Sequence, residues 1–216
     1  MLNFKMYIVD VLKTESNDFS KIGQNMSSQR NIRLLHATMG ISTEITELFE
    51  MIQSKNLDLT NLMEECGDAT WYIGIAVNEL GVDADSFFEK AKSLSLKNKN
   101  SLLEKSLMSL DFMKRKKIQK LLNKIVKSSG NSLDLMKKGV FYSREINLEK
   151  MEHFLIEILA DLISILKVGD FDIEETFQIN INKLHKKRFK SGQFSSQEAN
   201  NRNLEEERKT LESKGE

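Results

Sequence analysis

Hydrophobic residues recur every three to four positions along most of this chain, the spacing that places side chains on one face of an α-helix. The pattern is strongest over residues 30–53, 60–81 and 148–168. Weaker periodicity predicts further helices over residues 6–12, 83–96, 104–128 and 172–187, and a short one from about Ser196. This periodicity favours a wholly helical fold.

The polar positions between these segments predict where the helices begin and end. We expect Thr60 to cap the second strong helix and Gly81 to end it, and Gly169 to end the helix over 148–168. The stretch Ser-Ser-Gly-Asn-Ser over 128–132 is expected to break the helix before it, and KSLSLKNKNS over 92–101 is expected to be a linker. Residues 13–28 are expected to form a loop.

Composition narrows the class of protein. The chain has 216 residues, of which 40% are hydrophobic, and it contains no proline. A β-protein of this size without a proline in its turns would be unusual, which again favours an all-α fold. A single cysteine excludes a disulfide framework and a four-cysteine zinc site. The absence of a long apolar run and of a signal-peptide pattern predicts a cytoplasmic protein without a membrane span.

An internal repeat indicates how the helices are organised. The segment GVDADSFFEKAKSL over 81–94 has the pattern of GDFDIEETFQININKL over 169–184, and an offset of 89 residues superimposes 62–80 on 151–169. We therefore expect an all-α helical bundle built from a duplicated unit. The first copy occupies residues 1–96, and a degenerate second copy with a C-terminal segment and polar tail occupies residues 97–216, packed together as one domain.

Two acidic pairs carry the candidate chemistry, Glu44 with Glu47 and Glu65 with Asp68. Members of each pair are three residues apart and project from one side of a helix. Both pairs hold the same angular offset from the apolar stripe of their own helix. A short turn makes the two helices antiparallel, so equal offsets place all four carboxylates on one groove. A solvated helix face is the alternative for either pair alone.

Four adjacent carboxylates need neutralisation, and an all-oxygen ligand set suits Mg²⁺, with Mn²⁺ as a possible substitute. A di-iron bundle is the rival reading, but it uses Glu-x-x-His pairs, and no histidine follows a candidate glutamate at that spacing. The second copy has Asp134-x-x-Lys137 and Phe154-x-x-Glu157 at the aligned positions, which cannot form a second four-acid cluster. One metal site per chain is therefore expected.

The segment GISTEITELFEMI, a spacer and then MEECGDATWYIGIAVNELGVD resemble the all-α NTP pyrophosphatases, the superfamily of MazG-like and dimeric dUTPase-like enzymes. The resemblance covers residues 30–95. The duplicated organisation and INKLHKKRFKSGQF over 181–194 are similar to the dimeric dUTPase and dCTPase–dUTPase branch, whereas the tail is more similar to phage-type MazG-like proteins. Gln178 stands where that branch has a lysine, so the resemblance leaves the preferred base open.

The resemblance implies hydrolysis of a nucleoside triphosphate to the monophosphate and pyrophosphate. It implies that Glu44, Glu47, Glu65 and Asp68 hold Mg²⁺, with Glu47 as general base. The residues expected to contact the substrate are Tyr72, Asn182, Lys183, Arg188 and Lys190. A homodimer is expected by analogy with the family.

Alternatives remain open at this point. The substrate is either dUTP or dCTP, or a wider set of nucleoside triphosphates. A non-catalytic helical scaffold or regulatory protein that keeps the fold is the alternative of another class. The basic stretch over 104–128 invites nucleic-acid binding, but Lys plus Arg and Asp plus Glu each number 32, and a net charge of zero argues against that role.

Overall fold

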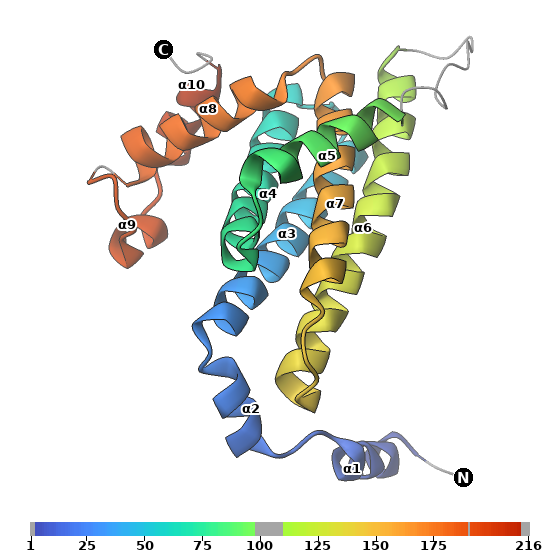
Figure 1. Cartoon of the computed structure of the whole chain (residues 1–216). Coiled ribbons are helices and arrows are strands. Elements are labelled where there is room, and N and C mark those ends of the chain that lie inside the picture. Colours follow the sequence, from blue (N-terminus) through green and yellow to red (C-terminus); the bar gives the residue numbers. More distant parts are fainter. Residues whose placement is uncertain (1–2, 98–109, 190, 213–216) are drawn as a thin grey trace.

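The computed structural model describes residues 3–97, 110–189 and 191–212. Within these residues the chain forms helices and no strands, which confirms the all-α prediction (Figure 1). No helix in this part of the chain is both long and apolar enough to cross a lipid bilayer.

Four long helices form the body of the molecule: α3 (Gln29–Gln53), α4 (Leu59–Leu80), α6 (Leu110–Tyr142) and α7 (Leu148–Val168). Contacts join α3 to α4, α4 to α7, α7 to α6 and α6 back to α3, so the four helices form a bundle (Figure 1). Helix α7 also receives α5, and eleven of its residues are buried. Its position explains why residues 148–168 are the most apolar stretch in the sequence.

The ends of α4 are set by two local devices. Asp58 is the N-cap, because its side chain accepts a hydrogen bond from the Asn61 backbone N–H at 3.1 Å; the predicted cap, Thr60, lies inside the helix. Both residues suit a cap, and the earlier one is used because aspartate also complements the positive helix terminus. Gly81 ends the helix with φ 68°, the left-handed conformation that glycine adopts at little cost.

Helix α6 corrects the prediction of a break at residues 128–132, because it continues unbroken to Tyr142. The serines of this stretch are buried and find partners across the bundle. Ser128 donates to Glu157 of α7 at 2.6 Å, and the hydroxyls of Ser129 and Ser42 of α3 are 2.8 Å apart. Tertiary hydrogen bonds thus satisfy hydroxyl groups that would otherwise favour a turn.

The remaining predicted helices are present with small shifts of their ends. Helix α5 (Ala84–Lys97) packs on α7, and α8 (Ile173–Lys183) packs on α4. Helices α5 and α8 therefore each pack on a helix of the other half of the chain, and the duplication stays a prediction. The predicted linker over 92–101 is helical as far as Lys97, and the rest of it lies outside the described residues.

The two ends of the chain hold more helix than the sequence predicts. Helix α1 (Phe4–Thr14) lies apart from the bundle and has no buried residues (Figure 1). The expected loop over 13–28 contains α2 (Phe19–Met26), which is capped by Asp18 and buries Ile22. After α8 come a π-helical turn (Leu184–Arg188), α9 (Ser196–Asn200) and α10 (Leu204–Glu212); the last of these was not predicted.

Candidate acidic metal site

The four predicted acids line one pocket. Glu44 and Glu47 project from α3, and Glu65 and Asp68 project from α4. The loop between Gln53 and Leu59 is short, so the helices run antiparallel and their acidic sides meet. The pocket has a volume of about 640 Å³, within the usual range for small-molecule sites.

Three of the acids form a tight group. Carboxylate oxygens of Glu44, Glu47 and Glu65 all lie within 4.8 Å of one another. Glu65 is buried, Glu44 is half-buried and Glu47 is exposed. We call these three residues the glutamate triad.

The pKa values of all three triad residues are raised above that of an ordinary glutamate. Burial, followed by the charges of Asp68 and Glu47, raises the pKa of Glu44 to about 7. Burial, followed by the charges of Glu47 and Glu64, raises the pKa of Glu65 to about 9. The side-chain interaction between these two residues raises the pKa of Glu65 further and lowers that of Glu44. Burial and Asp68 also raise the pKa of Glu47.

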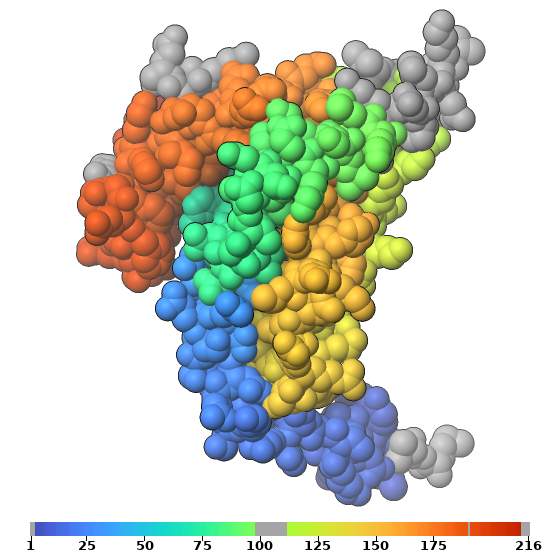
Figure 2. Space-filling view, viewed as in Figure 1, coloured from blue at the N-terminus to red at the C-terminus, as the bar shows by residue number. Residues whose placement is uncertain are grey.

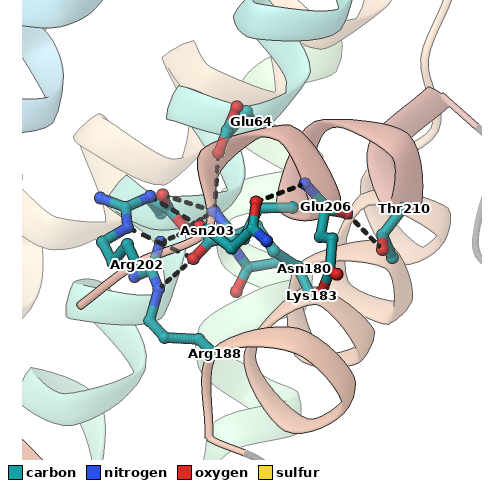
Figure 3. A network of polar contacts seen from close by, with 10 residues as sticks. Glu64, Asn180, Lys183, Arg188, Arg202, Asn203, Glu206 and Thr210 are labelled. Carbon is teal, nitrogen blue, oxygen red and sulfur yellow. Dashed lines mark hydrogen bonds and ion pairs between the residues drawn. The ribbon is translucent and has the colours of Figure 1, made fainter. Parts of the chain in front are cut away.

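Asp68 is in a different situation, because the protein supplies it with a cation. The Lys183 side chain is completely buried, and its Nζ lies 2.8 and 2.7 Å from the two carboxylate oxygens of Asp68 and 3.1 Å from Glu64. The Asn180 amide also donates a hydrogen bond to Asp68. Lys183 was predicted to contact the substrate, but it does not line the pocket, and its ammonium group is paired with Asp68 and Glu64 (Figure 3). Gly67 leaves room for this arrangement, since a Cβ there would press on Asn180.

The other predicted substrate residues divide into three groups. Tyr72 and Arg188 line the pocket. Asn182 does not line it, and its amide oxygen accepts a hydrogen bond from Gln178 at 3.2 Å. Lys190 lies outside the described residues.

An aromatic region forms the part of the pocket beside the acids. The Tyr72 ring makes edge-to-face contacts with Trp71 and His36, with ring centroids 5.0 and 5.4 Å apart. Tyr72 lies directly over Gly40 of α3, where a Cβ would overlap the ring. Phe189 and Phe194 line the same pocket with their centroids 5.5 Å apart. Such rings offer stacking faces to a planar ligand.

The sequence analysis missed the contribution of the C-terminal segment. Arg202, Glu207 and Arg208 line the pocket, and α10 packs on α4, α8 and the π-helical turn. Figure 2 shows this segment as a bulge beside the bundle. The tail carries no apolar stripe, so its only sequence signal was a series of opposite charges four residues apart, such as Glu205 with Lys209 and Arg208 with Glu212.

Comparison of the chain with family models, with curated proteins and with solved structures found no match. The resemblance to the all-α NTP pyrophosphatases therefore rests on the motifs in α3, α4 and residues 181–194 alone. What the site can do has to be argued from its geometry.

Proposed function

We propose that this protein is a Mg²⁺-dependent nucleoside triphosphate pyrophosphohydrolase, which converts a (deoxy)nucleoside triphosphate and water to the monophosphate and pyrophosphate. The observation that carries the proposal is the glutamate triad, three carboxylates with oxygens within 4.8 Å of one another in a pocket that also holds aromatic rings and arginines. The pocket thus offers groups for each part of a metal-bound nucleotide.

The triad fits a hard divalent cation. Its donors are all carboxylate oxygens, the ligands that Mg²⁺ and Mn²⁺ prefer, and burial together with neighbouring acids raises the pKa values of Glu44 and Glu65, so a bound cation would offset their charge. Glu44, Glu47 and Glu65 would hold the ion, with Asp68 beside them. When bound, Mg²⁺ supplies neutralisation of phosphate charge and lowers the pKa of a bound water.

The protein's own residues then have separate tasks. Glu47 is the triad member exposed to the pocket, and burial and the charge of Asp68 raise its pKa, which makes it a better proton acceptor than an ordinary glutamate. It accepts the proton of the water that attacks the α-phosphorus, while the bond to the pyrophosphate leaving group breaks. Tyr72 and Trp71 provide stacking faces for the base, and Arg188 faces the phosphates. Lys183 holds Asp68 in place from behind.

The proposal is tested by pyrophosphate release from a panel of ribo- and deoxynucleoside triphosphates with Mg²⁺. We expect Glu47→Gln to lower the rate by a factor of about 10² to 10⁴, the usual contribution of a general base. Glu50→Gln is the matched control, since Glu50 lies three residues further along α3, is exposed and does not line the pocket. The panel also decides between a dUTP or dCTP preference and a wider substrate range.

Two results would contradict the proposal. Unchanged release by Glu47→Gln would exclude the carboxylate mechanism. No release from any nucleotide would instead favour a helical scaffold that keeps the fold. The homodimer implied by the resemblance is a separate proposal, checked by light scattering of the full chain in solution.

A further inference from the structure

We propose that Arg188 and Arg202 together form a polyphosphate-binding site on the wall of the pocket built by the C-terminal segment, with Glu207 as the residue that positions both. The inference deepens the proposed function and rests on it for the natural ligand, a nucleoside triphosphate. The anion site itself can be tested without any nucleotide.

The geometry centres on one buried carboxylate. The side chain of Glu207 is 2% exposed and receives paired hydrogen bonds from two guanidinium groups. Arg188 approaches from the π-helical turn, with Nε and Nη2 at 3.2 and 2.6 Å from the two oxygens. Arg202 approaches from the segment before α10, with Nε and Nη2 at 3.4 and 2.7 Å (Figure 3). The two planar groups are therefore held in fixed orientations.

Glu207 stays ionised in this setting. Burial by itself would raise its pKa, but the hydrogen bonds and charges of Arg188 and Arg202 outweigh burial and lower the pKa to about 2. Two guanidinium charges and one carboxylate charge leave a net charge of +1 at this point of the pocket wall.

The excess charge faces the place where phosphates would lie. Each guanidinium has five N–H donors, and Glu207 uses two of them on each arginine. Both arginines line the pocket, and the Arg202 side chain remains 37% exposed despite its ion pair. Arg202 is within electrostatic reach of Glu47, and Arg188 is within reach of Tyr72. An extended anion that starts at the triad would meet both.

A polyphosphate matches this arrangement better than a single carboxylate or phosphate. It carries several oxygens along one chain, so it can contact a triad-bound cation and two separate guanidinium groups at once. A monophosphate carries all its oxygens on one phosphorus, so it contacts fewer of these groups at once. The site should therefore distinguish triphosphate from monophosphate.

The test measures binding of inorganic tripolyphosphate to the full-length protein by calorimetry, with Mg²⁺ in excess over the ligand. We expect Arg202→Gln and Arg188→Gln each to weaken binding about 10- to 100-fold, the range for loss of charge-assisted hydrogen bonds. Arg202→Lys should lose less, because it keeps the charge but not the planar fork. Lys209→Gln is the control, because it removes one positive charge from α10 at a side chain that is 68% exposed and pairs only with Glu205 in the described residues; its affinity should stay within about twofold of the wild type.

Thermal melts accompany the titrations, and Arg202→Lys carries the test if Arg202→Gln fails to fold. Wild-type affinity in both glutamine variants would overturn the inference, as would a wild type that does not bind tripolyphosphate. Equal loss in Lys209→Gln would also overturn it, since only net charge would then matter. Arginine-dependent binding by a protein that hydrolyses no nucleotide would keep the anion site and remove the proposed function. Nucleotide hydrolysis with an unchanged KM in Arg202→Gln would keep the proposed function and remove the anion site.

Discussion

Replacing Glu65 by glutamine should stabilise the metal-free protein, although the residue is buried in the candidate site. The side chain keeps its size but can no longer ionise. In the folded protein the pKa of Glu65 is about 9, whereas an unperturbed glutamate has a pKa of 4.5. A folded-state pKa above the unfolded value means that the folded state binds more protons. Stability is then full below pH 4.5 and falls as the pH rises towards 9.

The size of the effect follows from the same values. Each pH unit above 4.5 costs about 1.36 kcal/mol until the folded-state pKa is reached, which amounts to about 3 kcal/mol at pH 7. Because the ionisation of Glu44 is linked to that of Glu65, only part of this is gained, and we expect Glu65→Gln to increase the free energy of unfolding by about 1–3 kcal/mol. For a chain of 216 residues that corresponds to a rise in Tm of about 3–8 °C.

Circular dichroism melts in EDTA at pH 5 and pH 7 measure the gain, which should be large at pH 7 and small at pH 5. Added Mg²⁺ should raise the Tm of the wild type much more than that of the variant, because Glu65→Gln lacks a charged ligand. Glu89→Gln serves as control, since Glu89 is exposed on α5 and should change stability by less than about 0.5 kcal/mol. A variant that is less stable than the wild type in EDTA at pH 7 would refute the reasoning.

Three further expectations follow from the site. The rise in Tm caused by Mg²⁺ should grow from pH 5.5 to 8.5, because the ion binds the ionised triad and must displace the protons that Glu44 and Glu65 hold at lower pH; a Tm shift independent of pH would contradict the raised pKa values. Lys183→Met should lower the free energy of unfolding in urea by about 3–5 kcal/mol, since it leaves Asp68 without its buried counterion, and the double variant with Asp68→Asn should recover part of the loss. Gly40→Ala should cost about 1–3 kcal/mol and raise the KM for nucleotide, because the added methyl group displaces the Tyr72 ring; an unchanged KM with a lowered Tm would show that Tyr72 only packs.

The all-α fold and the convergence of the four acids on one pocket could be predicted from the sequence. Both are local properties: the apolar period identifies the inner face of each helix, and the spacing of Glu44 and Glu65 from that face fixes their direction. One further fact was needed, that the turn before Leu59 is too short for anything but antiparallel helices. The convergence in the pocket follows from these two points.

The wrong or missing predictions concern features that depend on contacts between distant parts of the chain. Residues 128–132 look like a turn because serine and glycine disfavour helix interiors, and only the partners offered by α3 and α7 keep α6 continuous. In the same way, no pattern in the tail shows that α10 would complete the pocket. Its charges become meaningful only when Glu207 is packed between Arg188 and Arg202.

The sequence by itself therefore determined the long helices, their inner faces and four carboxylates on one groove, because these depend on neighbours a few residues away. The tertiary structure decided that Lys183 forms an ion pair with Asp68 and that Arg188 and Arg202 of the C-terminal segment line the pocket. Lys183 and Asp68 are 115 positions apart in the chain. Lys183 and Asp68 meet only because α8 packs on α4, and the helical periodicity of the sequence does not predict how two helices pack.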